Sequence, residues 1–315
     1  MAAESETLEA KRLVEYFELP ARSFIGRCSG MRKPFEWTIN PYRGCEFGCR
    51  YCYARYTHEF MELRDPLQFE RKIYAKQWNA AEFGMELNRI PVGDTIALGT
   101  ATDPYQPAER RFGITRKMLE VFAGRSGFRL WITTKSNLVT RDLALLRQIA
   151  QGNIVGVNLS VTTLDTELAR LLEPLAPRPD LRIEAVRELS SAGLRTGVLC
   201  CPILPLLNDS ETSLNAVAEA AARAGASHLG GNVLFLKPCA QQVFFPFLEQ
   251  HFPRLVRRYK ERYGQNAYLR GSYVETVRDR VNRVRERHGL NSRTSGPLPT
   301  LWPAEQMDLF EREKS

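Results

Sequence analysis

The chain contains the stretch Asn40-Pro-Tyr-Arg-Gly-Cys45-Glu-Phe-Gly-Cys49-Arg-Tyr-Cys52-Tyr53, which holds three of its seven cysteines. Three residues separate the first two cysteines and two residues separate the last two. Three thiolates on one short loop can ligate an iron–sulfur cluster, because soft sulfur ligands suit iron. A four-iron cube held in this way keeps one iron open to a substrate or cofactor. Gly44 and Gly48 permit the tight backbone that such a loop requires.

A zinc site is the alternative interpretation of these cysteines. His58 lies six residues after Cys52 and could complete a Cys3His ligand set. Structural zinc sites more often combine two pairs of ligands, whereas this stretch offers a single triplet. We therefore favour an iron–sulfur cluster over zinc, and zinc over three cysteines that bind nothing.

The composition describes a globular protein of 315 residues, 43% hydrophobic and 25% charged. It contains no run of about 18 apolar residues, so no membrane span is expected. The first ten residues are acidic, where a secretory signal would be basic and then apolar. An odd number of cysteines without such a signal argues against a disulfide framework. We expect a cytoplasmic protein.

From Trp37 onward, short apolar runs alternate with helical stretches. The expected strands are 37–40, 95–99, 129–133, 154–161, 195–201 and 230–236. The helix-start signals are Thr140 before 141–150, Asp165 before a helix through Leu172, Asp180 before 181–192 and Ser213 before 214–224. Such alternation implies parallel strands joined by right-handed crossovers. We predict an α/β fold, a partial (β/α)6 TIM-type barrel with its active site at the carboxyl ends of the strands.

The chain divides into four expected parts: an N-terminal extension (1–35) with a short helix near Leu8–Phe17, the barrel core (36–240), a basic helical C-terminal segment (241–290), and a flexible linker and tail (291–315). In the basic segment, Val274, Val277, Val281 and Val284 recur on one face of a helix. The linker is rich in Pro, Gly, Ser and Thr.

The surplus of positive charge is concentrated near the C-terminus. Residues 254–288 hold eleven Lys or Arg against four Asp or Glu, while the whole chain has a net charge of +8. Concentrated positive charge attracts polyanions, most often nucleic acid, although a solvated helical surface is an equal alternative. The stretches 244–248 and 254–263 interleave aromatic and basic residues, as single-strand binders do. For these two stretches we favour helix packing.

The cysteine stretch resembles the radical S-adenosylmethionine (radical SAM) superfamily. The family's signature, C-x3-C-x-aromatic-C, is met by Cys45, Cys49, Tyr51 and Cys52. Five stretches resemble the branch that contains spore photoproduct lyase and its uncharacterised "DNA repair photolyase-like" relatives: 40–45, 52–55, 99–109, 133–136 and 172–174. The resemblance covers roughly residues 35–240, and the basic segment is also similar to the end of these relatives.

The resemblance implies a [4Fe-4S] cluster ligated by Cys45, Cys49 and Cys52, with S-adenosylmethionine (SAM) on the open iron. It implies reductive cleavage of SAM to a 5′-deoxyadenosyl radical that abstracts a hydrogen, with DNA or another nucleic acid as the favoured substrate. It also implies a flavodoxin- or ferredoxin-type reductant. The enzyme would be lyase-like or transferase-like. A radical SAM enzyme acting on a peptide or small molecule, and a non-catalytic metal-binding nucleic-acid adaptor, are the alternatives.

The resemblance also assigns residues to SAM. Lys135 matches a position that contacts the SAM carboxylate in spore photoproduct lyase. Thr102 and Asp103 follow the second strand, where the wider family has a Gly-Gly-Glu-Pro-like turn that this sequence lacks, and they are expected to contact the amino group. Ser160 is expected at the ribose or methionyl part, and Tyr51 at the adenine. The alternatives are that Lys135 is a surface lysine, that the Ser160 hydroxyl is hydrogen-bonded within its strand, and that Tyr51 is a core residue.

A hydrogen donor for the product radical is not evident. Spore photoproduct lyase carries a cysteine beside the second-strand turn, but this sequence has no cysteine between Cys52 and Cys200. The hypothesis is that Cys239, or Cys200 or Cys201, takes that role. The favoured alternative is that they are small buried hydrophobes.

The tail contains Gln306-Met-Asp-Leu309-Phe310. It resembles the pentapeptide with which bacterial polymerases and repair proteins bind the sliding clamp. Gln306 would be a polar handle, and Leu309 and Phe310 would be apolar anchors. The alternative is a tail helix that docks on its own domain.

Overall fold

Six parallel strands, joined in the order of the sequence, make up most of a seven-stranded sheet. The computed structural model describes residues 14–20, 23–28, 35–264 and 266–291. In spatial order the strands are β10 (His228–Val233), β9 (Arg195–Ile203), β8 (Ile154–Ser160), β7 (Arg129–Thr134), β6 (Thr95–Leu98), β3 (Trp37–Ile39) and β2 (Ile25–Arg27). In the described part of the chain β10 and β2 remain edges, which confirms the predicted partial barrel.

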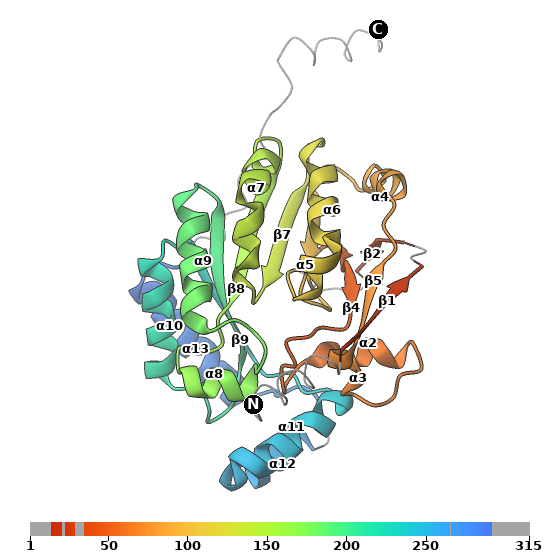
Figure 1. The fold of residues 1–315 in the computed structure, drawn as a ribbon. Helices are drawn as coiled ribbons and strands as arrows, with labels where there is room; N and C mark the ends of the chain where they lie inside the picture. Colours follow the sequence, from red (N-terminus) through yellow and green to blue (C-terminus); the bar gives the residue numbers. More distant parts are fainter. Residues whose placement is uncertain (1–13, 21–22, 29–34, 265, 292–315) are drawn as a thin grey trace, which may run out of the picture.

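Helices connect successive strands and cover the outer face of the sheet (Figure 1). Their bounds are α4 (Ala80–Leu87), α5 (Ala108–Phe112), α6 (Ile114–Ala123), α7 (Leu143–Ala150), α8 (Thr166–Leu172), α9 (Pro179–Ser191) and α10 (Glu211–Arg223). Every residue of β8 is buried, as expected for a central parallel strand that is covered on both faces.

Of the four predicted helix-start residues, Asp165 is a cap and the other three are not. α9 begins at Pro179 after Arg178, so Asp180 lies in its first turn. Asp165 caps α8 through bonds from the Glu167 and Leu168 amides, as predicted. Ser210, three residues before the predicted Ser213, caps α10. Thr140 is not a cap, because it lies inside a 3-10 turn (η2, Asn137–Asp142). This 3-10 turn begins almost directly after β7, and the Ser136 hydroxyl caps it by accepting a hydrogen bond from the Leu138 amide.

The described parts of the N-terminal extension contribute strands to both sheets. β1 (Glu15–Leu19) pairs in parallel with β5 (Lys72–Lys76), which pairs with β4 (Tyr42–Arg43), and β2 joins the main sheet beside β3. The predicted helix near Leu8–Phe17 is therefore wrong over residues 15–17, and residues 8–13 lie outside the described residues. Pairing with β5 favours a strand over a helix here, because Phe17 stacks on Tyr74 across the two strands.

The basic segment is part of the core. It forms α11 (Pro238–His251), a short 3-10 turn η3 (Pro253–Leu255), α12 (Val256–Tyr263) and α13 (Ser272–Arg287), so the predicted boundary after residue 240 falls inside α11. Val277, Val281 and Val284 of α13 join the main core, which confirms three of the four residues of the predicted valine face, while Val274 is half-buried outside it. Among the described residues, no helix is long and apolar enough to cross a membrane.

A second hydrophobic core joins α11 and α12 to the cysteine loop. It contains loop residues 45, 47, 49 and 51 together with Phe244, Phe247, Tyr259 and Tyr263. The aromatic residues of 244–263 are thus largely packed inside, which confirms the packing interpretation of that stretch. Figure 1 shows α11 and α12 at the end of the molecule toward which β7 points.

Candidate functional site

A cavity of about 320 Å³ lies at the carboxyl ends of the parallel strands. Its lining includes every residue that the sequence assigns to the cluster and to SAM, namely Cys45, Cys49, Tyr51, Cys52, Thr102, Asp103, Lys135 and Ser160. These residues come from four successive strand ends that are up to 115 positions apart in the chain. The parallel topology brings them together, as the barrel prediction requires.

The cysteine loop is held in place mainly by its backbone. The Cys45 amide donates to the Phe69 carbonyl at 2.9 Å. Arg55, in a 3-10 turn η1 (Tyr53–Arg55), is fully buried and donates to the Cys49 carbonyl at 3.0 Å. The same guanidinium pairs with Glu70 of α3 (Gln68–Arg71) at 2.6 Å. These contacts fix the loop independently of any metal ligand.

Gly44 is required for this arrangement. Its φ is +84°, and a Cβ would stand 2.7 Å from the Lys72 carbonyl oxygen and 2.8 Å from that of Phe69. We expect Gly44→Ala to displace the loop and reduce bound iron after reconstitution by at least about tenfold, because neither obstacle can move without moving backbone.

The matched control is Gly193→Ala. Gly193 has a φ of +82° but no atom within 4 Å of the added Cβ. This variant carries the same conformational cost of about 1–2 kcal/mol without the collision. It should keep its iron. Equal iron in the two variants would contradict the role given to Gly44.

Of the three cysteines, Cys45 and Cys49 are buried and Cys52 is half-buried. Burial raises the pKa of Cys49 to about 12 and also raises the pKa values of Cys45 and Cys52. They lose their protons on ligation, because a metal ligand must be deprotonated. Three sulfurs that line one apolar cavity suit a polynuclear iron–sulfur cluster.

His58 does not support the zinc alternative. Its Nε2 atom is 3.0 Å from the Lys72 carbonyl oxygen, and its ring packs against Phe69. It lies on α2 (Tyr56–Glu59) and is not among the residues that line the cavity. In the described ranges, no three His, Cys, Asp or Glu side chains are arranged to hold a single metal ion.

A buried ion network lies beside the cysteines, and its centre is Glu173. This carboxylate contacts Arg182 at 2.5 Å and Lys135 at 3.8 Å. It also accepts hydrogen bonds from the hydroxyls of Tyr51 and Thr162. Burial alone would raise the pKa of Glu173, but the opposite effect of Arg182 and Lys135 is larger, and the net pKa is about 2. The carboxylate is therefore ionised at neutral pH.

Lys135 remains charged inside the cavity. Burial lowers the pKa of its amine, but Glu173 and other groups more than offset burial, so the net pKa is raised. A buried cation that lines the cavity suits a carboxylate ligand. The network also gives the Tyr51 hydroxyl a partner and leaves its ring on the cavity wall. Direct contact of these residues with SAM stays a prediction.

Thr102 and Asp103 tie the second-strand turn to its neighbours. The Thr102 hydroxyl donates to the Gly44 carbonyl at 2.6 Å. Asp103 accepts from the Thr134 hydroxyl at 2.6 Å and from the Lys135 amide at 2.7 Å. Both side chains therefore position the cysteine loop and the third strand end. Whether they also bind the SAM amino group stays a prediction, as does the role of Ser160.

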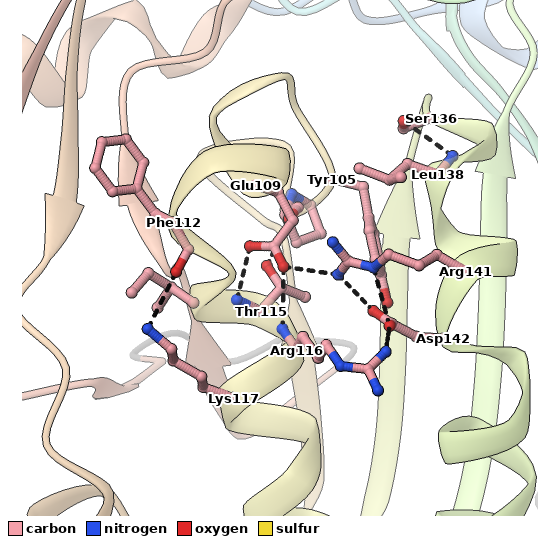
Figure 2. Close-up of polar contacts among 12 residues, drawn as sticks. Tyr105, Glu109, Phe112, Thr115, Arg116, Lys117, Ser136, Leu138, Arg141 and Asp142 are labelled. Atoms are coloured by element: carbon pink, nitrogen blue, oxygen red, sulfur yellow. Dashed lines mark hydrogen bonds and ion pairs between the residues drawn. The ribbon is translucent and has the colours of Figure 1, made fainter.

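A second ion network joins α5 and α6 to the 3-10 turn η2 (Figure 2). Glu109, fully buried on α5, accepts from Arg141 at 2.8 Å and from the Tyr42 hydroxyl at 2.5 Å. Asp142 is paired with Arg141 and with Arg116. No role for these residues is predicted from the sequence. The sequence feature that could have pointed to this network is Glu109, the last residue of the 99–109 stretch that resembles the family.

The three hypothetical hydrogen donors are placed differently. Cys239 is buried on α11 and is not among the residues that line the cavity. Cys200 donates from its thiol to the Thr162 carbonyl at 3.4 Å. Cys201 lines the cavity. Of the three, Cys201 is the one that the fold places where a donor would have to lie, and a donor role for any of them stays a prediction.

A partial barrel with three cysteines on the loop after its first parallel strand defines a scaffold for a cluster-dependent enzyme. The model of one family, the radical SAM superfamily, matches residues 39–215. The chain belongs to the radical SAM superfamily, whose cofactors are a [4Fe-4S] cluster and SAM.

Two relatives of this chain are uncharacterised proteins. An uncharacterised protein of Mycobacterium tuberculosis is 39% identical over 249 residues, which are 79% of this chain and 73% of the relative. An uncharacterised protein of Acidianus two-tailed virus is 31% identical over 63% of this chain and 67% of its own length.

Solved structures confirm the fold. Spore photoproduct lyase complexed with a dinucleoside spore photoproduct matches with a TM-score of 0.65. The match covers 87% of this chain and 79% of the lyase at 19% identity. A lyase mutant with bound AdoMet and the same dinucleoside matches with a TM-score of 0.62 at 17% identity.

Proposed function

We propose that this protein is a radical SAM enzyme that abstracts hydrogen from DNA or another nucleic acid, in repair or modification. When bound, the cluster and SAM supply one-electron cleavage of SAM and, through it, hydrogen abstraction. The observation that carries the nucleic-acid assignment is the position of the basic helix α12. α11 and α12 pack against the cysteine loop, so the positive charge of α12 lies at the cavity end of the molecule (Figure 1).

The side chains of the cavity divide the remaining work. Cys45, Cys49 and Cys52 would hold the cluster. The Lys135 amine would orient the carboxylate of SAM, and the Thr102–Asp103 turn would lie near its amino group. The lining includes Phe47, Phe69 and Leu199, and such apolar side chains exclude water from a reactive site.

The cations of the basic segment are not equivalent. On α13, Arg283 and Arg287 pair with Glu211 of α10 at 2.9 and 3.1 Å, which binds that helix to its neighbour. By contrast, Arg254 and Arg258 beside and on α12 are exposed, and no ion pair involves them among the described residues. A polyanion would therefore meet the α12 side of the segment.

We expect the protein to bind duplex DNA with a salt dependence that reports these contacts. Replacing both Arg254 and Arg258 with Gln should make the negative slope of log affinity against log salt concentration shallower by about 2, because two phosphate contacts are lost. Fluorescence anisotropy between about 50 and 200 mM salt measures the slope.

Arg283→Gln is the matched control, because its guanidinium is already engaged by Glu211. It should leave the slope unchanged. Absence of DNA binding by the unmodified protein at low salt would reject the nucleic-acid assignment and favour a peptide or small-molecule substrate. Failure to cleave SAM at all would favour the non-catalytic adaptor.

Two partner predictions rest on the sequence alone. The clamp-binding residues Gln306, Leu309 and Phe310 lie outside the described residues. Binding to a bacterial sliding clamp remains a proposal from the pentapeptide. A flavodoxin- or ferredoxin-type reductant remains a proposal from the family's chemistry.

A further inference from the structure

Three aromatic rings form a continuous row from the cavity to the molecular surface. Tyr53 and Phe235 line the cavity, with their ring centroids 5.9 Å apart. Phe235 stacks on Tyr268 with centroids 4.1 Å apart and an angle of 14° between the rings. Tyr268 is 61% exposed, although one face of its ring is covered by Phe235. We call Tyr53, Phe235 and Tyr268 the aromatic shelf.

The backbone fixes the shelf in place. Phe235 lies between Leu234 and Leu236, which are both buried. The Leu236 amide donates to the Ala267 carbonyl at 2.9 Å, which holds the segment of Tyr268 beside the end of β10. At the inner end, the Tyr53 hydroxyl donates to the Thr100 carbonyl. The exposed rings are therefore preorganised.

A cation accompanies the rings. The Lys237 amine lies 3.4 Å from the ring centroid of Tyr56 and 5.9 Å from that of Phe235. Tyr56 in turn stacks with Tyr53 at 6.5 Å. An exposed aromatic row with a positive charge beside it is complementary to a planar base on a phosphate strand.

We propose that the aromatic shelf binds an unstacked nucleobase, with Lys237 at the adjoining phosphate. This inference rests on the proposed nucleic-acid substrate and specifies how the strand is presented. A base cannot reach Tyr268 while it is stacked inside a duplex, so the strand must be single, or the base must be turned out. The base would extend the Phe235–Tyr268 stack at the entrance to the cavity.

The test uses the full chain, reconstituted with its cluster, and two fluorescent probes. One is a thymidine homopolymer of about 15 nucleotides, and the other is the same strand with abasic sugars in place of its central residues. Tyr268→Ala should bind the thymidine strand about tenfold or more weakly, with an unchanged salt slope, because the lost contact is stacking and not ionic. Tyr268→Phe keeps the ring and should bind normally.

The abasic probe separates stacking from damage to the structure. It should bind equally to the unmodified protein and to Tyr268→Ala. The shelf is rejected if Tyr268→Ala binds the thymidine strand normally, or if it loses affinity for both probes to the same extent. If the unmodified protein binds duplex DNA but neither of these single-stranded probes, the shelf proposal fails alone. If it binds no DNA of either kind, the proposed nucleic-acid function fails with it.

Discussion

Cys52→Ala should lose the iron–sulfur cluster and, with it, the cleavage of SAM. Cys52 lines the cavity with Cys45 and Cys49, and alanine offers no lone pair to the iron that Cys52 would ligate. We expect iron to fall from about four atoms per chain to near zero, and formation of 5′-deoxyadenosine to fall at least about 100-fold. Iron analysis and chromatography of the nucleoside measure the two effects.

Cys239→Ala is the matched control for this experiment. Cys239 is also a buried thiol, but it is not among the residues that line the cavity. Its replacement removes one sulfur from the chain and leaves the three loop cysteines intact, so iron and SAM cleavage should persist. Retention of a full cluster by Cys52→Ala would contradict the ligand assignment.

Glu173→Gln should be the most destabilising single change at the site that spares the cysteines. Glu173 is 2% exposed and is the shared partner of Arg182 and Lys135. Removal of its charge leaves Arg182 and Lys135 without the carboxylate that they share. Breaking a buried ion pair in this way costs about 3–5 kcal/mol, which urea unfolding measures.

The pH dependence gives this prediction a second test. The pKa of Glu173 is lowered from 4.5 to about 2, so its stabilising effect is present above pH 4.5 and is lost as the pH falls through about 2. The stability difference between the unmodified protein and Glu173→Gln should therefore be constant near neutral pH and shrink below 4.5.

Glu167→Gln is the control, because Glu167 forms an exposed ion pair with Arg170 on α8. Such surface pairs contribute at most about 1 kcal/mol. If the two variants unfold at the same urea concentration, the buried network does not stabilise the site as described.

The parallel strands could be predicted because their signals are local. Each is a short apolar run between helices, and β3, β6, β7, β8 and β9 start at the expected residues. β10 was placed two residues too late. Its first residue, His228, packs its ring where Gly197 of β9 has no side chain, a contact that only the tertiary structure reveals.

The N-terminal strands and the ion networks depend on distant partners. β1 has only five residues, and its pairing with β5 is invisible in its own sequence. Glu173 directly follows α8, and the fold brings the end of this helix to the strand ends where Tyr51 and Lys135 lie. The 172–174 stretch marked Glu173 as part of a family pattern but did not name its partners.

The charge count treated all cations of the basic segment as equally available to a polyanion. The sequence cannot show that Arg283 and Arg287 are turned toward Glu211 of α10, since 72 or more residues separate the partners. The cysteine loop, by contrast, carries its ligands, its glycines and its spacing within one short stretch. For this reason the cluster site could be located from the sequence, whereas the ion networks of Glu173 and Glu109 beside it could not.

The most direct test of the account is anaerobic purification followed by iron and sulfide analysis, and an assay of 5′-deoxyadenosine after addition of dithionite and SAM. The account predicts about four irons per chain and formation of the nucleoside. Zinc in place of iron, or a metal-free protein that leaves SAM intact after reconstitution, would contradict it.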